Sequence, residues 1–283
     1  MINHSCERIN GLVRAAVPRP LRNWLRSPSK SLEWMWDATM FSMGVTTTLQ
    51  ISPDLSIVCH PRAFKVAHEA QIVDPEQSAE FRRFLSFCGS AMFLFDIGAH
   101  FGVFSLAAAR FGGSAIAVDP SPIATRMIAR QVRLNGCSER IQIIEAAVND
   151  TNGTLDMLSS GVFSDGYFKV VRARSRKDLT RTQAITIDQM TSKFGAPSHI
   201  KIDVEGQEGS VLRGGKETLN QFSPVLFIEL HNEMIMSQGG DPNASLNELA
   251  LLGYKTFSLD GAPMQRATIF EKPIIRIVAS RSD

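Results

Sequence analysis

Three ionisable residues occupy alternate positions in residues 200–215, whose sequence is IKIDVEGQEGSVLRGG. Because side chains alternate along a strand, Lys201, Asp203 and Glu205 are predicted to share one face. Charged groups are costly to bury without partners, so we expect Lys201 to pair with a carboxylate. Asp203 and Glu205 are expected to reach the open carboxyl end of the strand, where Gly206 allows the chain to turn into a helix.

A second polar strand end follows in PVLFIELH, residues 224–231, where Phe227, Glu229 and His231 share a face. If the two strands are neighbours, their acids and the imidazole meet in one crevice, where they could transfer protons. A buried salt-bridge cluster without catalytic duty is the alternative. Carboxylates and an imidazole could also bind a hard cation, but their spacing is not diagnostic and we predict no metal. The candidate catalytic residues are Lys201, Asp203, Glu205, Glu229 and His231.

A glycine turn, DIGAHFG, spans residues 96–102 and directly precedes a predicted helix. Gly98 and Gly102 let the backbone turn sharply and approach a ligand closely. A dinucleotide enzyme would need the G-x-G-x-x-G spacing, whereas the spacing here is G-x-x-x-G, with Ala99 in place of a glycine. Asp96 at the strand end also suits a ligand with a cationic part better than a pyrophosphate. A tight strand-to-helix turn without a ligand is the alternative.

Asp119 lies 21 residues after Gly98, at the end of the next predicted strand, in the segment AVDPSP. A carboxylate at this place can accept hydrogen bonds from both ribose hydroxyls of a nucleoside. Such a contact fits S-adenosylmethionine and NAD equally well. An aspartate before proline is also common as a turn or helix cap, so the interpretation depends on its spacing from the glycine turn.

The elements that position these residues alternate between strands and helices from about residue 81 onward. Near-continuous apolar runs predict strands buried on both faces, as in a parallel sheet, with helices between them. The last two strands are separated by a short segment with Gly261 and Pro263, which predicts an antiparallel hairpin. The predicted strands are 93–98, 114–119, 140–148, 199–205, 224–231, 254–260 and 274–280.

Composition is that of an ordinary globular protein: 283 residues, 44% hydrophobic, 20% charged, with a net charge of +2. We therefore expect no nucleic-acid partner. Residues 1–30 hold six basic side chains against one acid. They are interpreted either as a basic anchor on an anionic membrane surface or as a solvated tail. We predict a basic, aromatic-containing extension over 1–50, a lead-in hairpin or helix over 51–80, and the catalytic domain over 81–283.

No secretory signal and no apolar run of transmembrane length are evident in the sequence. The four cysteines are widely spaced and form no Cys-x-x-Cys pair, which favours free thiols in a reducing compartment. We therefore expect a cytoplasmic protein without a transmembrane segment.

The segments DIGAHFG, AVDPSP, AITIDQM (a predicted strand), IKIDVEGQEGSVLRGG and PVLFIELH, in this order, resemble the FkbM family of methyltransferases. The resemblance covers roughly residues 85–232, and its most specific part is K-I-D-V-E-G-x-E. It implies a class I Rossmann-like α/β fold: a seven-stranded, mostly parallel sheet with an antiparallel last strand and helices on both faces. It also implies methyl transfer from S-adenosylmethionine to an oxygen of a sugar, glycan or polyketide-like natural product.

Carried over by motif, the resemblance also implies the cofactor contacts. His100 stands where the family usually has Asn, and Asp119 stands where Glu is common. No clear adenine-binding acid follows the third strand, so we expect backbone near Ala147 or the side chain of Asp150 to make that contact. The predicted cofactor-binding residues are Asp96, Gly98, Ala99, His100, Gly102, Asp119, Ala147 and, at the reaction end, Asp203.

For this chemistry a neutral hydroxyl needs a base within hydrogen-bond reach, and we predict Asp203, with His231 or Glu205 as alternatives. Two rival functions remain: an NAD-dependent oxidoreductase or epimerase, and an inactive cofactor-binding module. The missing glycine and the absence of a Tyr-x-x-x-Lys element count against the first. The full set of acids counts against the second.

Overall fold

A computed structural model describes residues 39–40, 42–61, 63, 75–159, 168–170, 179–265 and 269–281. The chain divides into two units, residues 1–43 and 44–283. Most of the predicted basic extension, residues 1–38, lies outside the described residues. The second unit carries all the predicted site residues.

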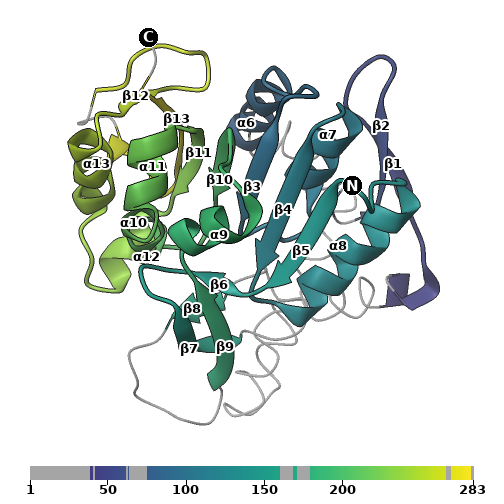
Figure 1. Ribbon diagram of the computed structural model, residues 1–283, viewed down its shortest axis with the longest axis horizontal. Helices are drawn as coiled ribbons and strands as arrows, with labels where there is room; N and C mark the ends of the chain where they lie inside the picture. The colour runs from purple at the N-terminus through teal and green to yellow at the C-terminus, as the bar shows by residue number, and fades with distance from the viewer. Residues whose placement is uncertain are drawn as a thin grey trace, which may run out of the picture. The chain divides into compact units, whose positions relative to one another are not determined.

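A seven-stranded sheet forms the centre of the second unit (Figure 1). Its order is β12 (Lys255–Phe257), β13 (Ile275–Ser280), β11 (Val225–Leu230), β10 (His199–Ile202), β3 (Phe93–Ile97), β4 (Ser114–Asp119) and β5 (Ile141–Glu145). β13 runs antiparallel to both β11 and β12, whereas β11, β10, β3, β4 and β5 are parallel. The predicted sheet is confirmed. Its strand order reverses between β3 and β10, which is where such sheets bind ligands.

Helices cover both faces of this sheet, as predicted. On one face lie α6 (Pro75–Leu85) and α7 (Val103–Arg110), whose rings Phe84 and Phe104 pack edge to face. Phe84 also contacts Phe227 of β11 at a centroid distance of 5.4 Å. The opposite face buries one large apolar core against α9 (Ile187–Phe194), α10 (Glu208–Arg213), α11 (Lys216–Phe222) and α13 (Pro242–Leu251).

Several helices begin where a cap satisfies their free backbone N–H groups. The side chain of Ser121 accepts a hydrogen bond from Ala124 N at the start of α8 (Pro122–Leu134). Thr186 caps α9 in the same way, so the segment AITIDQM, quoted above as a strand, turns helical after Ile185. That detail of the sequence interpretation is wrong, because a capping threonine followed by an acid outweighs the local β propensity.

A smaller sheet beside the main one escaped the sequence analysis. It contains β6 (Ala147–Val148), β9 (Leu179–Ile185), β7 (Gly153–Ser159) and β8 (Phe168–Val170), in that order. β7 pairs antiparallel with both β8 and β9, below the carboxyl edge of the main sheet in the view of Figure 1. The predicted strand over 140–148 is therefore two strands, β5 and β6, in different sheets.

Two further elements complete the described part: the hairpin of β1 (Thr47–Gln50) with β2 (Ser56–Cys59), and α12 (Asn232–Ser237). Cys59, Cys88 and Cys137 are free thiols, as the spacing predicted. Among the described helices, none has the length and apolar character needed to cross a membrane.

Candidate active site

A pocket lies at the carboxyl edge of the main sheet, at the reversal point between β3 and β10. The second sheet contributes to its wall through Leu155 and Met157 of β7, which supply apolar surface. Six of the predicted site residues line this pocket: Gly98, His100, Asp119, Ala147, Asp203 and Glu205. Ligand-binding and catalytic candidates therefore share one cavity.

The glycine turn joins the two halves of this pocket. Gly98 has φ +79°, and a Cβ at this position would lie 1.8 Å from the carbonyl oxygen of Asp203. Any side chain would collide with that backbone, so glycine is required here. The backbone N–H of Asp203 also donates to Ile97 O at 3.0 Å. The turn after β3 and the chain after β10 are thus in direct contact.

Asp119 ends β4 and is held by backbone donors of its own neighbourhood. His100, which itself has φ +49°, donates its N–H to Asp119 Oδ2 at 2.9 Å. Ser121 donates its N–H to Oδ1 at 2.8 Å. Burial raises the pKa of Asp119 to about 7 despite these donors. A carboxylate has about four acceptor sites, so Asp119 can still accept from two ribose hydroxyls.

Three of the predicted cofactor-binding residues, Asp96, Ala99 and Gly102, are not among those that line the pocket. Asp96 Oδ2 accepts hydrogen bonds from Ser105 N at 3.1 Å and Ser105 Oγ at 2.6 Å, which ties β3 to α7. Burial raises its pKa to about 6. Gly102 is the N-cap of α7 with φ +67°. In the structure these three residues belong to β3 and its connection to α7, and they do not line the pocket.

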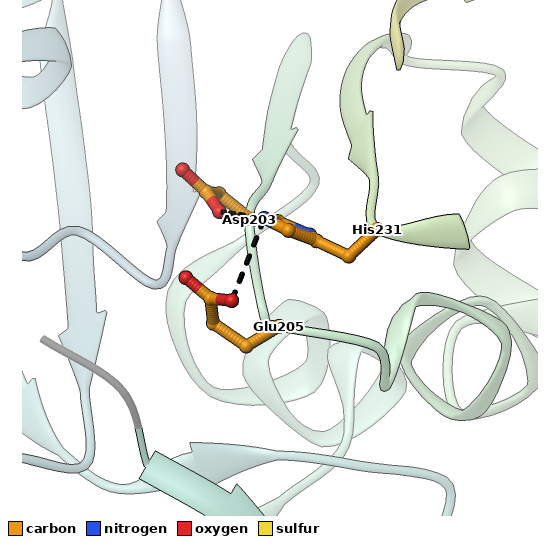
Figure 2. Close-up of side chains that lie close together, drawn as sticks. All are labelled: Asp203, Glu205 and His231. Carbon is orange, nitrogen blue, oxygen red and sulfur yellow. Dashed lines mark ion pairs between the residues drawn. The ribbon is translucent and has the colours of Figure 1, made fainter. Parts of the chain in front are cut away.

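Asp203, Glu205, Glu229 and His231 converge from the ends of β10 and β11, and we name these four residues the acid cluster. Figure 2 shows three of them, Asp203, Glu205 and His231. His231 Nε2 lies 3.8 Å from Asp203 Oδ1, 3.6 Å from Glu205 Oε2 and 3.7 Å from Glu229 Oε1. The strand ends at Ile202, so strand alternation does not place Glu205. The left-handed backbone conformation of Glu205, with φ +55°, directs its side chain toward His231 instead.

A fourth carboxylate, which sequence reasoning missed, anchors the histidine. Glu208, fully buried at the start of α10, lies with Oε1 2.8 Å from His231 Nδ1. The same oxygen accepts a hydrogen bond from Gly206 N at 3.0 Å. Glu208 is the last acid of K-I-D-V-E-G-x-E, so its place in the motif was a usable signal. The alternation of side chains along a strand did not reveal Glu208, because this residue lies in α10, after the end of β10.

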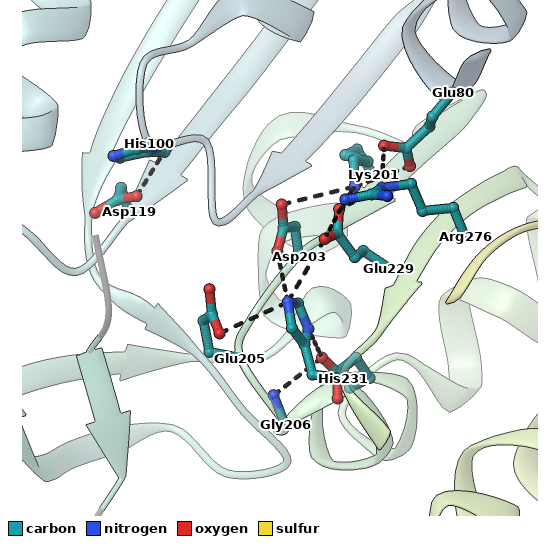
Figure 3. Close-up of polar contacts among 11 residues, drawn as sticks. Glu80, His100, Asp119, Lys201, Asp203, Glu205, Gly206, Glu229, His231 and Arg276 are labelled. Carbon is teal, nitrogen blue, oxygen red and sulfur yellow. Dashed lines mark hydrogen bonds and ion pairs between the residues drawn. The ribbon is translucent and has the colours of Figure 1, made fainter. Parts of the chain in front are cut away.

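Next to the acid cluster, at the upper right of Figure 3, lies a buried ion network of Glu80, Lys201, Glu229 and Arg276. Lys201 Nζ lies 3.0 Å from Glu80 Oε1 and 3.9 Å from Asp203 Oδ2, so the predicted pairing with a carboxylate is confirmed. Arg276 donates from Nε and Nη2 to the two carboxylate oxygens of Glu229, at 3.0 and 2.8 Å. Lys201 and Glu229 are not among the residues that line the pocket, so the network lies behind Asp203, outside the pocket.

Glu80 and Arg276 carried no sequence signal, because they come from α6 and β13, far from the motif. Burial alone would lower the pKa of Lys201, but the carboxylates of Glu80, Asp203 and Glu229 raise it above its ordinary value. Burial raises the pKa of Glu229, and Asp203 adds to that rise. Lys201 therefore stays charged and stabilises the carboxylates of Glu80, Asp203 and Glu229 around it.

The site brings five acids close to three basic side chains. Glu80, Asp203, Glu205, Glu208 and Glu229 face only two permanent cations among the described residues, Lys201 and Arg276. Burial raises the pKa of Glu205 to about 8, and the neighbouring acids contribute to the rise. Burial would lower the pKa of His231, but Glu208 and the other carboxylates raise it to about 9. At neutral pH Glu205 therefore holds a proton, and His231 adds a third positive charge.

Residues 96–256, more than half of the chain, match the model of the methyltransferase FkbM domain. A segment of 74 residues is 31% identical to ribosomal protein L11 methyltransferase of Pelotomaculum thermopropionicum. That segment is 25% of this chain and 24% of that protein, so the likeness spans about a quarter of the relative.

Solved methyltransferase structures are also similar to the chain. Methyltransferase FkbM of Methylobacillus flagellatus is 18% identical, with a TM-score of 0.47, over 71% of this chain and 46% of that one. An O-methyltransferase from Bacillus cereus in complex with SAH is 11% identical, with a TM-score of 0.43, over 94% of this chain and 96% of that one.

Proposed function

The chain belongs to the FkbM methyltransferase family, and from this premise we propose that it transfers the methyl group of S-adenosylmethionine to a hydroxyl oxygen of an acceptor. One observation carries the proposal. A single pocket is lined by the glycine turn at Gly98, by Asp119, and by Asp203 and Glu205 of the acid cluster. Nucleoside binding and proton removal would therefore occur within one cavity.

The residues present fit S-adenosylmethionine. Gly98 and His100 would lie along the methionine part, Asp119 would accept from the ribose hydroxyls, and Ala147 would lie beside the adenine, near the apolar side chains of β7. The carboxyl groups of Asp119, Asp203 and Glu205 along the pocket suit a sulfonium cation and disfavour a pyrophosphate. When bound, S-adenosylmethionine supplies a methyl group that is activated for in-line displacement.

Asp203 is assigned as the base that takes the proton of the acceptor hydroxyl. Its side chain is 34% exposed, against 18% for Glu205 and 4% for His231, so an acceptor in the pocket can reach it most easily. Proton removal makes the oxygen a better nucleophile toward the methyl carbon. The buried network behind Asp203 holds this carboxylate in place, and the walls of the pocket align the two reactants.

A sugar, a glycan or a polyketide-like natural product is the proposed class of acceptor. This choice rests on the family, because acceptor pockets carry no general code. A cytoplasmic location is also part of the proposal and is consistent with the free thiols of Cys59, Cys88 and Cys137. Most of residues 159–181, whose basic side chains are candidates for acceptor binding, lies outside the described part of the chain.

The test is transfer of a labelled methyl group to a panel of polyhydroxylated metabolites and cell-envelope glycans. We expect base-stable incorporation of label, as for an ether, and tight binding of S-adenosylhomocysteine by calorimetry. Binding of NAD without S-adenosylhomocysteine would support the oxidoreductase alternative. Cofactor binding without transfer to any acceptor would support an inactive module.

A further inference from the structure

Glu208 contacts both chain segments that carry the acid cluster. Its Oε1 atom lies 2.8 Å from His231 Nδ1, at the end of β11, and 3.0 Å from Gly206 N, in the turn after β10. Its side chain is completely buried and does not line the pocket. A carboxylate in this position touches neither cofactor nor acceptor, so any effect on the reaction must pass through the groups that it holds.

The contact with Glu208 determines which nitrogen of the His231 imidazole points toward the other acids. An ionised carboxylate only accepts hydrogen bonds, so His231 Nδ1 must carry a proton toward Glu208. Nε2 then points to the opposite side, where Asp203 and Glu205 lie 3.8 and 3.6 Å away (Figures 2 and 3). Without Glu208 the ring could flip or change tautomer.

The second hydrogen bond fixes the turn. Glu205 and Gly206 both have positive φ angles, +55° and +94°, which is a costly conformation for a glutamate. The N–H of Gly206 would be unsatisfied without the carboxylate of Glu208. One buried oxygen therefore holds the strained turn that aims Glu205 and, at the same time, the ring of His231.

We propose that Glu208 is a positioning residue for methyl transfer: it fixes the His231 ring with Nε2 toward Asp203 and Glu205, and it fixes the turn that carries Glu205. The proposal rests on the proposed function of the acid cluster. His231 acts as a cation between the carboxylates and keeps Asp203 oriented toward the acceptor. The charged groups that face or flank this ring are Glu208 from α10, Asp203 and Glu205 after β10, Glu229 from β11, and, behind Glu229, Lys201 and Arg276.

Glu208→Gln separates a positioning role of Glu208, which needs its negative charge, from a purely structural role, which needs only its hydrogen bonds. The amide oxygen can still accept from both donors, so the fold should be retained, but the negative charge is lost. We expect the pKa of His231, raised to about 9 in the native protein, to fall toward its ordinary value, because a neutral amide stabilises the imidazolium less. NMR titration of the ring, assigned with a His231→Gln variant, measures this fall and requires no acceptor.

For activity, we expect kcat to fall about tenfold to a hundredfold, which corresponds to the loss of a charge-assisted hydrogen bond. The alkaline limb of the pH profile should move toward neutral pH, with unchanged affinity for S-adenosylhomocysteine. Glu139→Gln, at an exposed glutamate, is the matched control. An unchanged His231 titration in a folded Glu208→Gln protein would overturn the inference, as would an unmoved pH profile. If the native protein methylates no acceptor, the proposed function fails, but the ring titration still decides whether Glu208 holds His231.

Discussion

On the β3–β4 side of the pocket, the polar contacts are local. Asp119 is held by backbone N–H groups of His100 and Ser121, and Asp96 is held by Ser105 of the next helix. On the β10–β11 side, each buried acid depends on a side chain from another element. Glu80 comes from α6, Glu208 from α10 and Arg276 from β13. The first side can therefore be altered with local consequences, whereas the second couples chemistry to stability.

The largest effect separates catalysis from cofactor binding. Asp203→Asn should lower kcat by about 10²–10⁴-fold, because it removes the assigned general base. Affinity for S-adenosylhomocysteine should change little, since the glycine turn and Asp119 remain intact. Labelled-methyl turnover and calorimetry measure the two quantities. Asp54→Asn, at an exposed aspartate between β1 and β2, is the control. Near-native turnover of Asp203→Asn would reject the assignment.

The buried network should dominate stability. Lys201→Met leaves Glu80 and Glu229 with one fewer cation in a region sealed from water, and we expect a loss of about 3–5 kcal/mol in the free energy of unfolding. Lys216→Met breaks a surface pair with Glu248, 3.2 Å apart, and should cost less than about 1 kcal/mol. Urea titrations give both values. Equal losses for the two variants would mean that the buried network contributes no more to stability than a surface ion pair.

The local side should control binding. Asp119→Asn removes the charged acceptor for the ribose hydroxyls and should weaken S-adenosylhomocysteine binding about tenfold to a hundredfold. Because the cofactor binds the carboxylate form, native affinity should rise with pH and level off above about 7, the pKa of this acid. Below that pH the loss approaches about tenfold per unit. Calorimetry from pH 5.5 to 8.5 measures the slope, which should vanish in Asp119→Asn. A flat native profile would contradict the role of Asp119.

This contrast also explains what could be predicted from sequence. The glycine turn, Asp119 and the acids of K-I-D-V-E-G-x-E form contiguous motifs, so they and the seven-stranded sheet were predicted. Glu80 and Arg276 are brought in by tertiary packing of α6 and β13, which no local spacing encodes. The small sheet was missed because β7 and β9 pair across a polar, Arg-rich segment without clear apolar alternation. Motifs thus identified the reacting groups, and packing decides what holds them.

Metal removal should have the smallest effect. Asp203, Glu205 and His231 each offer a ligand atom, and these atoms lie within 4.8 Å of one another, so the acid cluster could in principle bind a divalent cation. A metal ligand must be deprotonated, however, and the pKa of His231 is raised to about 9 by Glu208 and the neighbouring acids. At neutral pH a proton therefore occupies the imidazole, and a cation would have to displace it.

We accordingly expect methyl transfer at pH 7 to be unchanged after dialysis against EDTA and after addition of Mg²⁺ or Mn²⁺. Transfer assays before and after chelation measure this, with calorimetric Mn²⁺ titration as an independent readout. If EDTA abolished turnover and Mn²⁺ restored it, a cation would take the place of the His231 proton between Asp203 and Glu205. Glu208 would then orient a metal ligand rather than an imidazolium. In that case the β10–β11 side would be a metal centre, and the buried network would hold metal ligands in place rather than a general base.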